Sequence, residues 1–197
     1  MIPTLILAST SRYRADLLGR LGLAFEAVAP GVDEFPQGGE SPRRQALRLA
    51  QAKAGAVARR YPGSWVIGSD QVADLGGRIL GKPGDAARCR AQLAAESGSV
   101  VEFHTAAVLL RHEPRSTFEH VDRTSVRFRT LSEAEIARYV ELDSPFDCAG
   151  GFRSEGLGAA LFESMETCDP AALVGLPLIW LAGALRAAGL DPLAPQS

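Results

Sequence analysis

The sequence predicts an α/β fold, because segments with strand character and segments with helical character alternate through its first half. Residues 5–8 form a short apolar run, and a helical pattern of apolar positions follows at 12–21. A second helical pattern, at 41–60, precedes another apolar run at 65–67. Further along, two long segments rich in β-branched and aromatic residues flank a short loop, which predicts an antiparallel hairpin.

The length and composition indicate one folded unit. The chain has 197 residues, of which 46% are hydrophobic, enough for one sizeable core or for two small lobes that share a cleft. This apolar content excludes disorder. Since no repeat or linker divides the sequence, we expect a single domain over residues 1–197, with a frayed tail at 191–197.

The charge and cysteine content narrow the partners and the compartment. A net charge of −2 gives no overall basic field for a nucleic-acid polymer or a membrane surface. No apolar stretch is long enough to span a bilayer, and residues 1–4 lack the basic region of a signal peptide. The three scattered cysteines fit a reducing compartment, so we expect a cytoplasmic protein.

The first strand and helix are well delimited. Residues 5–8 are apolar at every position, as in a strand buried on both faces. Hydroxyl residues at 9–11 can cap the helix that follows, and Gly22 ends it. Residues 24–29 predict a second strand.

The second helix begins at Ser41 and Pro42, a capping hydroxyl followed by proline at the first helical position, and runs to about Arg60. Its predicted buried stripe consists of Leu47, Ala50, Ala54, Val57 and Tyr61. A buried strand at 65–67 follows, and a short strand is expected at 78–80.

The second half predicts a helix, a hairpin and two more helices, at residues 85–96, 100–110 with 118–129, 132–142 and 177–188. Ser132 and Glu135 form a capping box, with Leu131 and Ile136 placed for a hydrophobic staple. The glycine-rich, charged segment 148–157 predicts a functional loop.

A phosphate site is predicted after the first strand. Residues 9–14 combine hydroxyls and arginines with the free N–H groups of a helix start, and phosphate oxygens bind such groups. Plain helix capping is the alternative interpretation.

Two acidic positions follow predicted strands. Asp70 follows the strand at 65–67, where a carboxylate can deprotonate water or hold a divalent cation, unless it only caps a turn. Glu34 lies beside Asp33 just past the second strand, and one of the two can face the same crevice. Together with Asp70 it could complete an oxygen site for magnesium or manganese, the alternative being a solvated surface acid.

Lysine is scarce, since only Lys53 and Lys82 occur among 21 basic residues. Lys53 is expected on the flank of its helix's buried stripe, from which it can snorkel to solvent or point into a cleft. Lys82 lies in a stiff loop before Pro83. Both are compact charges suited to phosphate, while coding drift is the alternative.

Glu155 lies in the glycine-rich loop. From there a carboxylate can accept two hydrogen bonds from a guanine edge, and an exposed loop acid without a role is the alternative.

An ordered set of short motifs covers almost the whole chain. They are Leu-Ala-Ser-Thr-Ser at 7–11, Arg14, Val-Asp-Glu at 32–34, Ala-Lys-Ala at 52–54, Gly-Ser-Asp at 68–70, Gly-Lys-Pro at 81–83, Ser-Glu-Gly at 154–156 and Leu-Val-Gly-Leu-Pro at 173–177. The set resembles the Maf family of nucleoside triphosphate pyrophosphatases. The resemblance implies a two-lobed Maf/inosine-triphosphatase-like α/β fold with a curved mixed sheet, a long antiparallel hairpin and a central cleft. It also implies hydrolysis of a nucleoside triphosphate to the monophosphate and pyrophosphate, with a divalent cation as cofactor.

The resemblance also implies the roles of single residues. Asp70 would be the general base, a metal ligand or both, and Glu34 a metal ligand. The phosphate-binding residues would be Ser9, Arg14, Lys53 and Lys82.

Three positions sort the family by substrate. Tyr13, Gln71 and Glu155 are similar to the branch that acts on 7-methyl-GTP, which has an aromatic residue, Gln and Glu there. The dTTP/UTP branch has Arg, Thr and Gln instead. Arg12 and Tyr13 stand where the family usually has Pro and Trp.

We therefore expect a small nucleotide as the partner, and a homodimer stays open. The alternative functions are a dTTP/UTP pyrophosphatase, a non-catalytic nucleotide-binding regulator of cell division, and a phosphatase that releases orthophosphate.

Overall fold

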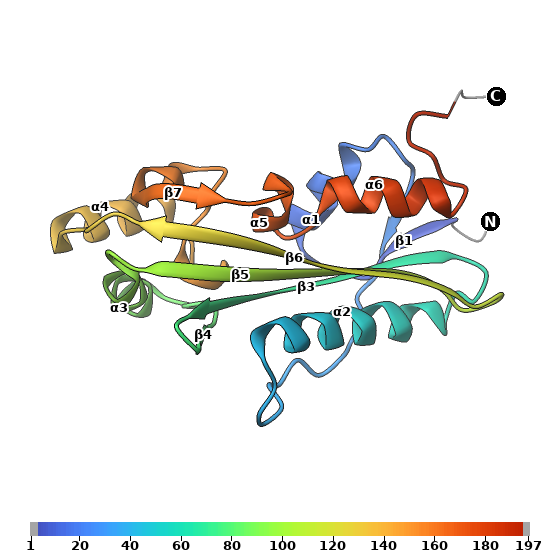
Figure 1. The fold of residues 1–197 in the computed structure, drawn as a ribbon, viewed down its shortest axis with the longest axis horizontal. Coiled ribbons are helices and arrows are strands. Elements are labelled where there is room, and N and C mark those ends of the chain that lie inside the picture. Colours follow the sequence, from blue (N-terminus) through green and yellow to red (C-terminus); the bar gives the residue numbers. More distant parts are fainter. Residues whose placement is uncertain (1–3, 195–197) are drawn as a thin grey trace.

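A seven-stranded mixed sheet forms the centre of the molecule in the computed structural model, which describes residues 4–194 (Figure 1). The strands are β1 (Leu5–Leu7), β2 (Glu26–Ala27), β3 (Trp65–Leu75), β4 (Arg78–Leu80), β5 (Val100–Arg111), β6 (Ser116–Phe128) and β7 (Phe162–Glu166). Their order is β2-β1-β3-β5-β6-β7, and β4 pairs with β3 outside this path. Because β1 runs parallel to β2 and β3 while the other pairs are antiparallel, the predicted α/β class with a mixed sheet is confirmed.

The helices gather at three places around the sheet (Figure 1). They are α1 (Arg12–Gly19), α2 (Pro42–Ala58), α3 (Ala86–Glu96), α4 (Glu133–Asp143), α5 (Pro170–Val174) and α6 (Leu178–Ala187), with 3-10 turns at Ala149–Gly151 and Leu157–Leu161. Helix α2 packs along β3 and β5, whereas α1 and α6 lie on the other side of the long strands. Helices α3 and α4 lie together at one end of the long strands, where they share a hydrophobic core with β5, β6 and Phe152.

Strand β3 extends further than the sequence predicts. Its end was expected at residue 67, but it continues to Leu75, because β5 pairs with it from Val66 to Asp74. The expectation that Asp70 follows the strand is therefore wrong, since this residue lies in the middle of β3. The apolar run at 65–67 identifies only the first part of β3. The polar residues at 69–71 continue the strand because their backbone still pairs with β5.

Strand β2 is shorter than expected. It covers two exposed residues rather than residues 24–29, because it lies at the edge of the sheet and pairs only with β1.

Helix α2 begins as predicted, with the Ser41 hydroxyl accepting from the Arg44 N–H. Its buried stripe contains Ala50, Ala54 and Val57, as expected. Leu47 and Tyr61 are only partly buried. Lys53 was expected on the flank but is 5% exposed within the stripe, because its ammonium is paired with carboxylates.

The second half largely follows the predicted pattern. Helix α3, the β5–β6 hairpin, α4 with its capping box, and α6 lie where they were predicted. Strand β7 and helix α5 were not predicted. The expectations for residues 1–3 and for the last three residues of the tail fall outside the described residues. Across residues 4–194, no helix combines the length and the apolar character needed to cross a bilayer.

Candidate active site

A cavity of about 1010 Å³ opens beside the middle of β3. Its walls come from the start of α1, the loop before α2, the middle of β3, the loop after β4 and the segment 147–155. All the site residues suggested by the sequence line it, namely Ser9, Tyr13, Arg14, Glu34, Lys53, Asp70, Gln71, Lys82 and Glu155. The volume is in the range of small-molecule sites.

Two carboxylates converge on one ammonium group in this cavity. Lys53 Nζ lies 2.6 Å from Asp70 Oδ1 and 2.8 Å from Glu34 Oε1. Lys53 reaches this position from α2 and Asp70 from β3, two elements in close contact. Glu34 comes from the loop that precedes α2. Asp70 is buried, whereas the Glu34 side chain is 58% exposed, so the pair connects the interior to the open cavity.

Burial raises the pKa of Asp70 above its ordinary value, and the nearby charges of Lys53 and Arg14 oppose that rise. A carboxylate in this environment is a better proton acceptor than an exposed one.

The start of α1 faces the cavity with a cation and hydroxyl groups. Ser11 caps the helix through its hydroxyl, which accepts from the Arg14 N–H, and the Ser9 hydroxyl accepts from the Ser11 N–H at 3.1 Å. Arg14 Nε donates to the carbonyl of Gly175 at 3.0 Å, which fixes the guanidinium. Burial lowers the pKa of Arg14, and the charges of Asp70 and Glu34 act in the opposite direction.

Lys82 is exposed on the loop that joins β4 to α3. Within residues 4–194 its ammonium has no hydrogen-bond or ion-pair partner, so it can reach a ligand in the cavity without breaking an internal contact.

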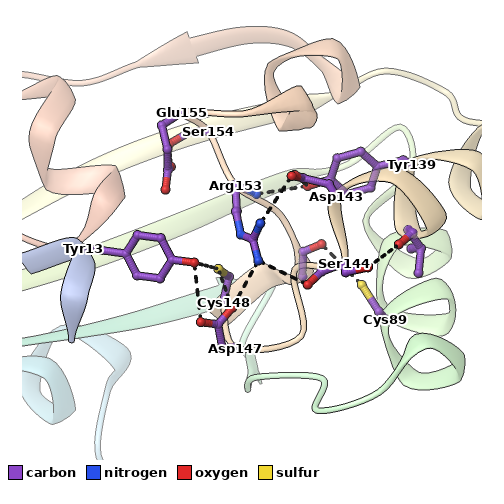
Figure 2. A network of polar contacts seen from close by, with 12 residues as sticks. Tyr13, Cys89, Tyr139, Asp143, Ser144, Asp147, Cys148, Arg153, Ser154 and Glu155 are labelled. Atoms are coloured by element: carbon purple, nitrogen blue, oxygen red, sulfur yellow. Dashed lines mark hydrogen bonds and ion pairs between the residues drawn. The ribbon is translucent and has the colours of Figure 1, made fainter. Parts of the chain in front are cut away.

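Tyr13, which lines the cavity, takes part in a polar network (Figure 2). The Tyr13 hydroxyl accepts from Arg12 Nη2 at 2.9 Å and donates to Asp147 Oδ2 at 3.4 Å. The Arg12 guanidinium carbon also lies 4.9 Å from the centre of the Tyr13 ring, a cation–π distance. The ring that sequence reasoning assigned to base stacking therefore already has a cation against it.

Arg153 anchors the loop that carries Glu155. Its guanidinium lies 3.5 Å from Asp143, 3.7 Å from Asp147 and 3.2 Å from the Ser144 carbonyl. Figure 2 shows the neighbouring Glu155 side chain directed toward the side on which Tyr13 lies. Glu155 is exposed, and its carboxylate is 3.3 Å from the Ser154 hydroxyl.

Some residues of the site were not identified from the sequence. Asp147 lines the cavity, and Gly175 supplies the carbonyl that holds Arg14. The Thr105 hydroxyl accepts a hydrogen bond from Gln71 Nε2 at 2.9 Å. The sequence carries no local signal for Thr105, because its partners Gln71 and Ala172 come from other elements. Asp147 directly precedes the segment predicted as a functional loop.

The donor set fits a hard divalent cation. Across residues 4–194, no group of three histidine, cysteine or acidic side chains could hold a metal. Glu34 and Asp70 nevertheless already hold a cation, the Lys53 ammonium, between two carboxylate oxygens. Magnesium commonly binds through one or two carboxylates and completes its shell with water and substrate phosphates.

Comparison with known proteins gives one consistent family. The chain matches the family described as Maf-like protein over residues 4–188. A relative from Xanthomonas oryzae pv. oryzae, named 7-methyl-GTP pyrophosphatase, is 56% identical over 189 residues, covering 96% of this chain and 98% of the relative. A relative of the same name from Bordetella avium is 51% identical over 195 residues, covering 99% and 98%.

A solved structure, the Staphylococcus aureus Ham1 protein, shares the fold. It matches with a TM-score of 0.52 at 11% identity, covering 93% of this chain and 98% of the other.

Proposed function

Because this chain belongs to the Maf-like protein family, we propose that it is a nucleoside triphosphate pyrophosphatase whose substrate is 7-methyl-GTP. It cleaves the bond between the α-phosphorus and the bridging oxygen with water, so the products are 7-methyl-GMP and pyrophosphate. The observation that carries the proposal is a buried carboxylate, Asp70, in one cavity with Arg14, Lys53 and Lys82.

The cations of the cavity bind the triphosphate. Arg14 and Lys82 contact its oxygens together with the Ser9 hydroxyl and the first N–H groups of α1, which have no partner within the helix. Lys53 joins them once substrate charge competes with its two carboxylates. These groups stabilise the negative charge that develops on the leaving pyrophosphate.

Asp70 accepts the proton of the attacking water. Its raised pKa makes it more basic than an exposed aspartate, and the ammonium of Lys53 holds the carboxylate in place. As pyrophosphate leaves, the proton stays on Asp70 until it is exchanged with solvent.

Glu34 and Asp70 are the residues that would hold a divalent cation, magnesium or manganese. When bound, such an ion would supply positive charge that neutralises the charge of the phosphates. Glu34 is exposed enough to move toward it, while Asp70 is fixed within β3.

The methylated base is selected by three side chains of the cavity. Tyr13 offers the positively charged base the face of its ring that Arg12 does not cover, and Glu155 and Gln71 offer acceptors to the N–H groups of the base.

The free thiols Cys89, Cys148 and Cys168 support a cytoplasmic location.

A substrate panel tests the proposal. Purified protein with magnesium is given 7-methyl-GTP, GTP, dTTP and UTP, and the released anion is identified and its rate measured. We expect pyrophosphate, with the highest kcat/KM for 7-methyl-GTP. Release of orthophosphate, a preference for dTTP or UTP, or binding without turnover would each overturn it.

The contribution of Glu155 is tested in the same panel. Glu155→Gln replaces one acceptor oxygen with a donor, so the preference for 7-methyl-GTP over UTP should fall. An unchanged substrate ranking would count against its role.

A further inference from the structure

The side-chain amide of Gln71 is held in one orientation by three oxygen atoms. Its Nε2 donates to the carbonyl oxygens of Ala172 at 3.0 Å and Leu173 at 2.9 Å, and to the Thr105 hydroxyl at 2.9 Å. Carbonyl oxygens can only accept hydrogen bonds, so the nitrogen of the amide must face them. The amide has two hydrogens for these three acceptors, so one hydrogen is shared between two of them and the donors are fully used inside the protein.

Thr105 is the central residue of this arrangement. It lies directly opposite Gln71 in the β3–β5 ladder and is completely buried. Its hydroxyl donates to the Ala172 carbonyl at 2.9 Å, which leaves the oxygen free to accept from Gln71. Thr105 does not line the cavity, so it can act on a ligand only through Gln71.

The other atom of the amide remains available. Gln71 is half-buried and lines the main cavity, and no residue between 4 and 194 donates a hydrogen bond to its Oε1. Turning the amide over would place Oε1 against two carbonyl oxygens and lose the bonds that Nε2 makes there. A ligand in the cavity therefore meets an acceptor at this position.

We propose that Thr105 is a positioning residue for substrate choice. Together with the α5 carbonyls, it fixes Gln71 so that this side chain offers the base an acceptor only. The proposal rests on the proposed function and adds the chemical rule for selection. A guanine edge carries three N–H hydrogens, at N1 and N2, and the acceptors of Glu155 and Gln71 match them, whereas uracil and thymine carry one, at N3.

The test compares two substrates that differ by one amine. 7-Methyl-GTP and 7-methyl-ITP carry the same charge on the base, but the second lacks the N2 amine. We measure kcat/KM for both with the wild type, Gln71→Met, Thr105→Val and Thr105→Ser. The wild type should prefer 7-methyl-GTP, and Gln71→Met should lose part of that preference, because Glu155 can still accept from the N2 amine.

For Thr105, the two replacements give opposite results. Thr105→Val keeps the shape but removes the hydroxyl, so the preference should fall by about fivefold, the effect of one modest hydrogen bond. Thr105→Ser keeps the hydroxyl and should keep the preference. Thr124→Val is the matched control, because Thr124 is also buried on the sheet but bonds Thr167 instead.

Two outcomes overturn the inference. These are a full preference for the amine in Thr105→Val, and a full preference in Gln71→Met, which does not depend on how Thr105→Val folds. Failure of the proposed function is a different result, because the wild type would then release no pyrophosphate from 7-methyl-GTP.

Discussion

Lys53 occupies a position on α2 that would otherwise exclude a charge. Its neighbours one turn away and one residue away, Ala50 and Ala54, are fully buried, and a buried ammonium without a partner is strongly unfavourable. The carboxylates of Asp70 and Glu34 remove that penalty. The three residues therefore depend on one another, and a change at one of them alters the charge state of the whole cluster.

Asp70→Asn tests the assignment of the base. Asparagine keeps the size of the side chain but cannot take a proton from water, so pyrophosphate release should fall at least about 100-fold. Release is measured under saturating 7-methyl-GTP, and thermal unfolding checks that the variant is folded. Asp33→Asn is the control, because Asp33 is an acid in the same loop as Glu34 but does not line the cavity. Near-normal turnover in Asp70→Asn would reject the assignment.

The same residue gives a dependence on pH. The raised pKa of Asp70 means that its carboxyl becomes protonated at a higher pH than an exposed aspartate would. The wild-type kcat/KM should therefore fall as the pH decreases through the pKa of Asp70.

Replacing each lysine with arginine tests whether lysine is required. Lys53→Arg puts a larger, planar group between Asp70 and Glu34 in a buried space, so kcat/KM should fall by about 10-fold to 100-fold through misplacement of the cluster. Lys82→Arg changes an exposed loop residue and should lower kcat/KM less, with no loss of stability. If both variants keep full activity, the scarcity of lysine reflects coding drift alone.

The contact between α2 and β3 depends on a glycine. A Cβ at Gly68 would lie 2.2 Å from the carbonyl oxygen of Ala50 and 2.7 Å from the nitrogen of Ala54. The backbone of α2 can avoid this clash only by moving away from β3. The same contact between α2 and β3 brings Lys53 to Asp70.

Gly68→Ala should therefore lower both stability and activity. The free energy of unfolding should fall by about 1–3 kcal/mol, the usual effect of overpacking, as measured by urea denaturation. The matched control is Gly55→Ala on α2, where a Cβ would meet only the flexible end of Arg59 at 3.6 Å. Gly55→Ala should instead raise stability by about 0.5–1 kcal/mol. A Gly68→Ala variant as stable as the wild type would show that the interface can adjust.

At the scale of elements, capping signals decided which parts could be predicted. Helices α2 and α4 begin at Ser41 and Ser132, where the hydroxyl bonds the third residue of the helix, and that signal is local. Strand β7 is short and mostly exposed, so it has no apolar alternation to identify it. The extension of β3 depends on pairing with β5, which residues 68–75 alone do not reveal.

At the scale of the molecule, the separate parts of the site could be predicted, but their contacts could not. The motif set pointed to Glu34, Lys53 and Asp70 individually, and all three line the cavity. Their shared ion pair arises because α2 packs against β3, a tertiary arrangement that the spacing of residues in the sequence does not encode. Thr105 was missed for the same reason, since its role depends on α5 packing over the sheet.

One buried acid should make the stability of the whole molecule depend on pH. Glu96, at the end of α3, is fully buried, and its Oε2 has no hydrogen-bond partner among residues 4–194. Burial raises its pKa to about 9, although Gln92 and Arg78 oppose the rise. Between the pKa of an unfolded glutamate and this value, the folded state binds more protons than the unfolded state. The contribution of Glu96 to stability is therefore fully present below the pKa of an unfolded glutamate and is lost as the pH rises toward 9.

Glu96→Gln removes that dependence. Glutamine fills the same space without a charge, so the midpoint of thermal unfolding should change less between pH 5 and 9 than in the wild type. The advantage of the variant should grow with pH to about a few kcal/mol, because the wild type must either keep the proton or bury a charge. Glu133→Gln, at an exposed position on α4, controls for the loss of a negative charge in general. Equal slopes for the wild type and Glu96→Gln would mean that the carboxyl reaches solvent or a partner, and that another group sets the pH dependence.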